Sequence, residues 1–173
     1  MLFTLFFMRK ILSAVGVVAI LIVILIINPF TIVDAGERGV VLTWGAFEGT
    51  VLQPGLHFVT PIAQRVVKMD VRTDKLEIEN SEAYSRDLQL VQIHSVLNYH
   101  VDEQKVGSLY QNVGLGYKDK ILQPALEAAI KQVVAKYTAE EILSKRAELQ
   151  TEVEGVIRDS VSSNQIVVTK YSF

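Results

Sequence analysis

The pattern of apolar and charged positions divides the chain near residue 30. Residues 11–30 contain no Asp, Glu, Lys or Arg. An α-helix rises about 1.5 Å per residue, so this stretch spans about 30 Å, the thickness of the hydrocarbon core of a bilayer. The pattern predicts a transmembrane anchor over residues 11–30, preceded by a short segment of residues 1–10. The anchor side chains are Ile11, Val17, Ile20, Ile24, Ile27 and Phe30.

The charges that flank this stretch predict its orientation. Arg9 and Lys10 precede it, and Asp34 and Glu37 follow it. The positive-inside bias therefore places the N-terminus in the cytoplasm or matrix and the rest of the chain across the membrane. Two alternatives stay open. A signal peptide could be cut after Ala35, although the stretch is longer than a usual signal core of roughly 7–15 residues. A re-entrant hairpin would instead leave the domain on the cytoplasmic side.

Residues 31–173 have the patterning of one folded domain. Alternation of apolar and polar residues is the mark of a half-buried strand, and it predicts strands over residues 39–44, 66–71, 75–79, 88–101 and 166–173. Gly49, with Gly45 just before this range, predicts a turn over residues 46–50. Pro54 and Gly55 predict a second turn, because proline presets one turn dihedral and glycine supplies the positive φ that follows.

Helical spacing dominates the second half of this domain. Asp102 is expected to cap a short helix that ends before Gly114. Apolar residues at helical spacing predict further helices over residues 121–137 and about 144–162, and Pro124 must lie in the first turn of its helix. Residues 138–141 form a capping-box sequence. Strands followed by helices and a last strand predict an α+β fold with a mostly antiparallel sheet.

Composition narrows the possible functions. The net charge is −2 and there is no basic run, which argues against nucleic-acid binding. The absence of cysteine removes disulfides and thiol chemistry. His94 and His100 share a strand face but lie too far apart, at about 20 Å, to bind one metal ion. No catalytic serine elbow or nucleotide-binding loop is present. The sequence therefore predicts no enzyme activity, no cofactor and no metal site.

Four segments resemble the SPFH (band 7) superfamily, in particular its prohibitin-like members of bacterial type. They are residues 33–41, 53–61, 85–89 and 124–141, and they occur in the family's order behind an N-terminal apolar segment. The resemblance covers nearly all of residues 31–173, which it identifies as an SPFH domain. Family members continue into a long coiled coil that this sequence does not include, so the chain is either a fragment or a short member.

The resemblance implies a non-enzymatic membrane scaffold. Such proteins assemble into homo- or hetero-oligomeric rings or cages with related SPFH subunits, organise a membrane microdomain, and in some cases restrain an FtsH-type membrane protease. The domain of prohibitin-like members lies in the periplasm or the intermembrane space, and the bacterial inner membrane is favoured over the mitochondrial one. The alternative is an accessory module that regulates a membrane protease without forming a closed ring.

Two groups of residues are candidates for contacts that such a scaffold needs. Trp44, Phe47 and Phe58 lie near the membrane exit in sequence, and aromatic side chains favour the membrane interface. We expect them to contact lipid, and the alternative is ordinary core packing. A helix with charges of both signs could meet complementary charges on a neighbouring subunit. Its predicted interface residues are Arg146, Glu148, Glu152 and Arg158.

Overall fold

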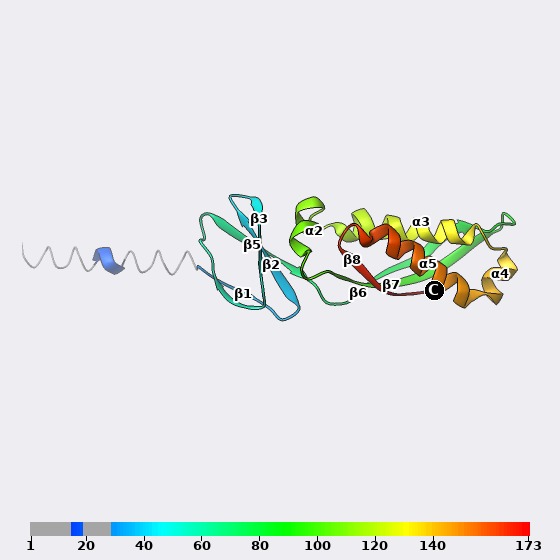
Figure 1. Cartoon of the computed structure of the whole chain (residues 1–173), viewed down its shortest axis with the longest axis horizontal. Coiled ribbons are helices and arrows are strands. Elements are labelled where there is room, and N and C mark those ends of the chain that lie inside the picture. Colours follow the sequence, from blue (N-terminus) through cyan, green and yellow to red (C-terminus); the bar gives the residue numbers. More distant parts are fainter. Residues whose placement is uncertain (1–14, 19–28) are drawn as a thin grey trace, which may run out of the picture.

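The computed structural model describes residues 15–18 and 29–173 and confirms the predicted α+β fold with antiparallel sheets. The described molecule is elongated, as Figure 1 shows. The strands β1 to β5 (within residues 30–70) lie at the end where residue 29 enters, and β6 to β8 (within residues 74–172) lie with the helices toward the other end. We call residues 29–73 the proximal half and residues 74–173 the distal half.

The proximal half contains two small antiparallel sheets. One pairs the first and fourth strands, and the other has the order β3-β2-β5. The strands are β1 (Phe30–Val33), β2 (Glu37–Thr43), β3 (Ala46–Leu52), β4 (Gly55–Phe58) and β5 (Gln64–Asp70). The strand β1 was not anticipated, and Phe30 is its first residue rather than the last residue of a membrane helix.

The prediction of a turn over residues 46–50 is wrong, because these residues belong to β3. The chain reverses two residues earlier, at Trp44 and Gly45, which have φ values of 50° and 86°. Two consecutive positive φ values are typical of a type I′ hairpin turn, whose twist matches that of the flanking strands. The turn before Gly55 is present, and Gly55 has the positive φ that was predicted for it.

The distal half consists of one antiparallel sheet covered on one face by helices (Figure 1). In the sheet, β7 (Leu90–Val101) lies between β6 (Asp74–Tyr84) and β8 (Ile166–Ser172). The helices are α2 (Val106–Asn112), the π-helical turn η1 (Lys118–Leu122), α3 (Gln123–Val134), α4 (Ala139–Ser144) and α5 (Arg146–Ser162). Buried and exposed residues alternate along β7, because only one face of the sheet meets the helices.

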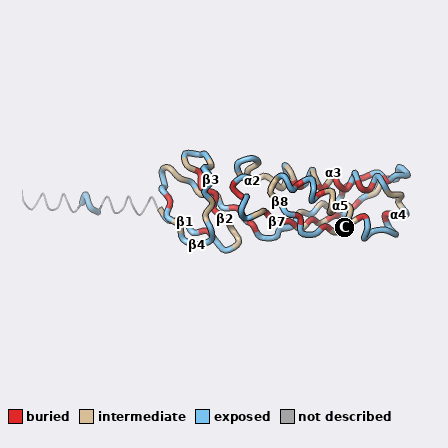
Figure 2. The backbone as a smooth tube through the Cα atoms, in the orientation of Figure 1, coloured by how far each residue is buried: buried red, intermediate tan, exposed pale blue. Residues whose placement is uncertain are grey.

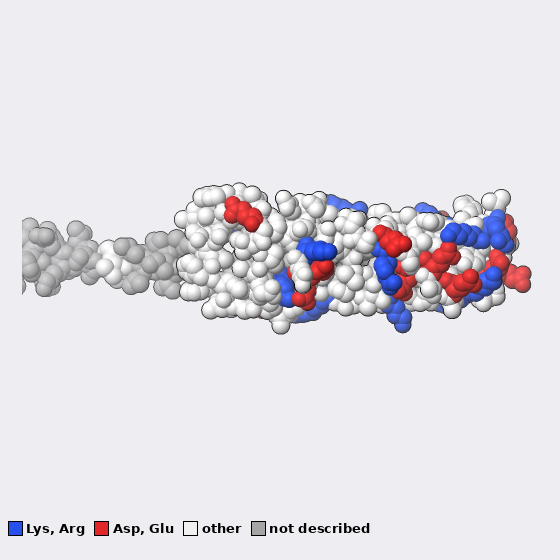
Figure 3. All heavy atoms as spheres, in the orientation of Figure 1, with Lys and Arg blue, Asp and Glu red and all other residues white. Residues whose placement is uncertain are grey.

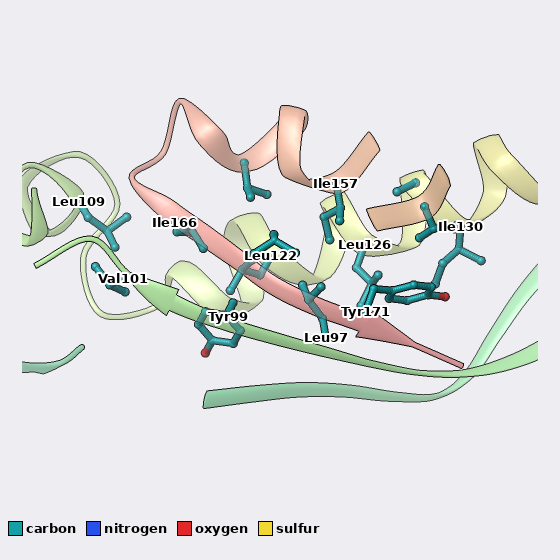
Figure 4. Packing of buried hydrophobic residues seen from close by; sticks show 14 of the residues in the cluster. Leu97, Tyr99, Val101, Leu109, Leu122, Leu126, Ile130, Ile157, Ile166 and Tyr171 are labelled. Carbon is teal, nitrogen blue, oxygen red and sulfur yellow. The ribbon is translucent and has the colours of Figure 1, made fainter. Parts of the chain in front are cut away.

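The core lies between this sheet and helices α3 and α5. Figure 4 shows Leu97 and Tyr171 from the sheet packed with Leu126 from α3 and Ile157 from α5. Figure 2 shows the same pattern as buried backbone along the inner sides of the helices and β7. Buried residues of β2, among them Val40, join the same cluster, so the two halves share one core.

Two helix starts predicted from local sequence agree with the structure, and one does not. The predicted capping box is confirmed: Thr138 Oγ1 accepts a hydrogen bond from the Glu141 amide at 3.2 Å, and the Glu141 carboxylate accepts one from the Thr138 amide at 3.0 Å. Pro124 lies in the first turn of α3, as expected. The prediction that Asp102 caps a helix is wrong. Its carboxylate accepts a hydrogen bond from the Gln104 amide, and the helix begins only at Val106.

Besides the shared core, two side-chain contacts at or next to α2 join the proximal half to the distal half. The Phe47 ring of β3 lies directly over Gly107 of α2, where a Cβ atom would overlap it. The nearly buried Arg38 side chain of β2 forms an ion pair with Glu103, just before α2. Helix α2 is therefore the element that fixes the proximal sheet on the distal one.

A polar cluster ties the start of β6 to β7 and η1. The Asp74 carboxylate accepts hydrogen bonds from Lys118 Nζ at 2.5 Å and from the Tyr99 hydroxyl at 3.5 Å. The bond from Lys118 is the main reason why the pKa of Asp74 lies below its usual value. Burial, assisted by the Asp74 charge, raises the pKa of Tyr99 to about 12.

This cluster predicts a dependence of stability on pH. Because the pKa of Asp74 is lower in the folded state, its stabilisation is complete above the unfolded pKa of about 3.9 and is lost as pH falls through the folded value. Asp74 is half exposed, so we expect Asp74→Asn to cost only roughly 0.5–1 kcal/mol at pH 7. Thermal unfolding from pH 7 to pH 2 would show the two proteins converging in acid. A constant difference at every pH would contradict this assignment.

The predicted anchor lies mostly outside the described residues. Four of its predicted side chains lie outside the described residues: Ile11, Ile20, Ile24 and Ile27. Residues 15–18, which include Val17, are described and are helical and exposed. Within residues 15–18 and 29–173, no helix is long and apolar enough to cross a membrane.

Candidate membrane-facing site

The ribbon formed by β1 and β4 has one partly buried face and one exposed apolar face. Phe30 is paired with Phe58, and Ile32 is paired with Leu56. Directly paired residues point to the same side of an antiparallel sheet, so these four side chains share one face. All four are exposed, whereas Val33 on the opposite face is buried. The rings of Phe30 and Phe58 meet edge to face, with centroids 5.8 Å apart.

Backbone hydrogen bonds bring two further apolar side chains to the same end of the ribbon. The Val59 amide donates to the carbonyl of Pro29, so the end of β4 lies where residue 29 enters. The chain then turns through residues 60–63, and the Trp44 amide donates to the Ala63 carbonyl. Trp44 and Ile62 are each 77% exposed. We call Phe30, Ile32, Trp44, Leu56, Phe58 and Ile62 the apolar end face.

Charged residues are absent from the segments that build this face. Residues 39–47 and 49–64 contain no Asp, Glu, Lys or Arg. Figure 3 shows the consequence on one side of the molecule, where charged side chains gather in the middle and toward the far end, and the end next to the grey spheres is uncharged apart from a small acidic patch. An apolar patch of this kind on a folded protein marks an interaction surface.

The conformation of Trp44 adds to this picture. A non-glycine residue with positive φ is uncommon and costs about 1–2 kcal/mol relative to the right-handed region. The turn between β2 and β3 holds a large, exposed ring in this conformation. Strained backbone conformations of this kind cluster at functional sites, where a residue contacts a ligand or partner.

The structure separates the three residues predicted to contact the membrane. Phe58, which is 71% exposed, and Trp44 both belong to the apolar end face. Phe47 is half-buried, and its ring packs on Gly107 of α2, so its position is explained by packing within the protein. Sequence reasoning missed Ile32, Leu56 and Ile62. The alternation in the β1 and β4 sequences, together with the lack of charge, was the signal that could have revealed them.

The predicted subunit-interface residues all lie on α5, but their side chains differ in availability. The Glu152 carboxylate binds Lys136 Nζ at 2.5 Å and the Tyr137 hydroxyl at 2.8 Å, and these two partners lower its pKa. Arg158 pairs with Glu154 one turn away. The Arg146 guanidinium lies 5.0 Å from the centre of the Phe173 ring. Glu148 is exposed. Their role at a subunit interface remains a prediction.

His94 and His100 have local partners. His94 Nε2 lies 3.0 Å from Glu77, and His100 Nδ1 lies 3.3 Å from the Thr169 hydroxyl. Among the described residues, no group of three or more His, Asp or Glu side chains could hold a metal ion. The features that call for a functional explanation in the described chain are thus surfaces rather than clusters of reactive groups.

The geometry defines a class of protein: an antiparallel α+β domain with an uncharged strand face at one end. The chain belongs to the SPFH domain / Band 7 family, whose match covers residues 31–170. It is 29% identical over 148 residues to Prohibitin-2 of Mus musculus. The aligned stretch covers 82% of this chain and 49% of that relative. It is 27% identical over 141 residues to Prohibitin-1 of Colletotrichum higginsianum, with coverages of 81% and 51%.

A plant relative extends the same picture. The chain is 26% identical over 141 residues to Prohibitin-7, mitochondrial, of Arabidopsis thaliana, with coverages of 81% and 50%. The chain therefore spans about half the length of the curated relatives that it matches. The family match includes the apolar end face, apart from Phe30, and the helical layer of the distal half.

Proposed function

We propose that this protein is a non-enzymatic membrane scaffold subunit whose apolar end face rests in the outer part of a lipid bilayer. In this proposal the anchor ends at Pro29, one residue before the end of the predicted 11–30 segment, and the domain begins immediately afterwards with β1 at Phe30. The single observation that carries the proposal is the apolar end face. It lies where residue 29 enters the fold, so an anchor ending there would bring it to the bilayer.

The energetics of side-chain burial favour contact between the apolar end face and the bilayer. Full burial of a Phe, Leu or Ile side chain stabilises by about 1.5–3 kcal/mol each. Trp44 suits the interfacial zone, because its ring is apolar and its indole N–H can bond to headgroups or water. With no Lys, Arg, Asp or Glu in β1 or β4, insertion of the ribbon requires the desolvation of no charge.

The flanking charges support one orientation. With Arg9 and Lys10 on the inner side, the domain would lie in the periplasm or, for an organellar protein, in the intermembrane space. The name of the Arabidopsis relative assigns that protein to mitochondria. We retain the bacterial inner membrane as the favoured location for this chain, on the resemblance of its motifs.

Within the membrane plane, we propose that the subunits assemble with copies or relatives into a ring or cage that can enclose an FtsH-type protease. The observation behind lateral assembly is the helix α5, which presents Arg146, Glu148 and Arg158 outside the core. The alternative is an accessory module that holds a protease without closing a ring.

The mass of the detergent-solubilised full-length protein tests assembly. We expect a large homo-oligomer that dissociates in the double variant Glu148→Lys/Arg158→Glu. Glu152 is unsuitable for this purpose, because its reversal would also break the bonds to Lys136 and Tyr137. A matched control is Lys75→Glu on the far face of the sheet. A small particle of fixed mass, unchanged by the double variant, would contradict ring assembly and favour the accessory module.

A further inference from the structure

Arg65 is the only Lys or Arg side chain of the proximal half without a partner in the described part of the chain. Residues 29–73 contain four such basic residues. Three of them have a carboxylate within 4.0 Å, in the pairs Arg38 with Glu103, Lys68 with Asp34 and Arg72 with Asp70. Arg65 is exposed, and none of the described residues forms a hydrogen bond or ion pair with its guanidinium. The N–H donors of this side chain are therefore available to a ligand.

Arg65 lies next to the apolar end face. The Trp44 amide donates to the Ala63 carbonyl, and two residues further along β5 Arg65 is paired with Leu42 of β2. A strand rises about 3.3–3.4 Å per residue, so the Cα atoms of Ala63 and Arg65 lie about 7 Å apart. The strand β5 leads from there to β6 in the distal half, so Arg65 lies behind the end face, on the side away from the bilayer.

This spacing matches the thickness of a lipid headgroup layer. The hydrocarbon core of a bilayer is about 30 Å thick and the whole bilayer about 40–45 Å, so each headgroup layer is about 5–7 Å thick. Tryptophan side chains favour the boundary between acyl chains and headgroups. With Trp44 at this boundary, Arg65 lies at the level of the lipid phosphates.

One acidic side chain of the proximal half also lacks an ion pair with any described residue. Glu48 is exposed and lies in β3. The strand β2 separates β3 from β5, so the backbones of these two strands are two strand spacings, about 10 Å, apart. This distance exceeds the screening length of about 8 Å at physiological salt, so Glu48 cancels little of the charge of Arg65.

We propose that Arg65 binds the phosphate of an anionic phospholipid whose acyl chains contact the apolar end face. This inference rests on the bilayer contact proposed above and names the lipid that it selects. A guanidinium is always charged, and its planar fork can donate two parallel hydrogen bonds to phosphate oxygens. A free phosphate ion offers the same oxygens but would leave the apolar end face without a ligand. A phospholipid satisfies both the charge of Arg65 and the apolar side chains beside it.

Trp44 can report which lipid lies beside it, because it is the only tryptophan of the chain. The full-length protein is placed in vesicles of phosphatidylcholine with a minor fraction of phosphatidylglycerol. Bromine is carried by one of the two lipids in a first sample and by the other in a second sample. We expect phosphatidylglycerol to be enriched around Trp44 roughly fivefold over its fraction in the vesicle, which is the gain that one basic residue near an anionic surface provides.

Two variants tie the enrichment to Arg65. Arg65→Gln should abolish the enrichment of phosphatidylglycerol, while brominated phosphatidylcholine still quenches Trp44. The side chain is exposed, so the melting temperature should not change. The matched control is Lys68→Gln, which removes one positive charge from the same strand but from a side chain that already pairs with Asp34 and Glu37. This control should keep the enrichment. Inorganic phosphate, exchanged for chloride at constant ionic strength, should also leave it unchanged.

Four results would overturn the assignment of Arg65 while the bilayer contact stands. They are an absence of enrichment in the unmodified protein, enrichment that persists in Arg65→Gln, an equal loss in Lys68→Gln, and displacement of the lipid by inorganic phosphate. In each case brominated phosphatidylcholine would still quench Trp44, which shows that the apolar end face lies in the bilayer. A lack of quenching by both brominated lipids would overturn the bilayer contact and, with it, the lipid site.

Discussion

Replacing Gly107 by alanine is expected to destabilise the protein by about 1–2 kcal/mol, although alanine is the better helix former by about 1 kcal/mol. Gly107 lies in α2 and has no room for a Cβ atom, because the Phe47 ring occupies that space. The added methyl group would push the ring away and loosen the contact between the two halves. Chemical unfolding of the full-length protein in detergent would measure the change.

The control is the same substitution in a second background, where its effect on the free energy of unfolding should change sign. In a Phe47→Ala background the obstruction is gone, so Gly107→Ala should stabilise by roughly 0.5–1 kcal/mol through helix propensity alone. A Gly107→Ala effect of the same sign and size in both backgrounds would show that Phe47 does not pack on α2. Phe47 would then return to the list of side chains available for lipid.

Truncation of Leu97 to alanine is expected to cost about 3–4 kcal/mol, within the range of buried leucines that leave a cavity. Leu97 is fully buried in the central strand β7, where it is paired with Tyr171 of β8 and packed beneath the helices. The loss should lower the melting temperature by roughly 2–4 °C for each kcal/mol. Differential scanning calorimetry of the detergent-solubilised protein would measure it.

Leu143→Ala is the matched control, since it removes the same atoms from an exposed leucine. Its effect should stay within about 0.5 kcal/mol. If both variants lost similar stability, Leu143 would be covered in the isolated protein, and the helical layer would have to be packed differently. If neither lost stability, Leu97 would not be part of the core.

Local chemistry explains which parts of the fold could be predicted from sequence. The capping box at Thr138 and the position of Pro124 depend on neighbouring residues only, and both are confirmed. The long strand over β7 was predictable because its alternation extends over many residues. The Trp44-Gly45 turn was missed because it lacks the Asn-Gly or Asp-Gly pair that usually marks a type I′ turn.

The parts that could not be predicted depend on contacts between distant residues. An aspartate before a helical pattern indicates a cap, but the Asp102 carboxylate also satisfies a turn of its own, which delays α2. A phenylalanine near the membrane exit suits lipid or core equally well, and only α2, about sixty residues later, decides for Phe47.

The candidate site could likewise be predicted only in part from the sequence. Phe58 and Trp44 were identified from residue type and position in the chain, and the structure brings them together at one end. Their companions Ile32 and Leu56 follow from strand pairing, which places them on the face that Phe30 and Phe58 begin. A continuous face is a stronger basis for a membrane contact than three separate aromatic residues.

The central claim is that the apolar end face rests in the bilayer, and Trp44 can report on it directly because it is the only tryptophan of the chain. The measurement is quenching of Trp44 fluorescence by lipids brominated at different depths, with the full-length protein in vesicles. A matched control moves the reporter to the far tip of the molecule in the double variant Trp44→Phe/Leu88→Trp. We predict strong quenching of Trp44 by bromine near the headgroup end of the acyl chains, weaker quenching by deeper bromine, and none of the control. Full access of Trp44 to aqueous acrylamide without quenching by any brominated lipid would contradict the claim.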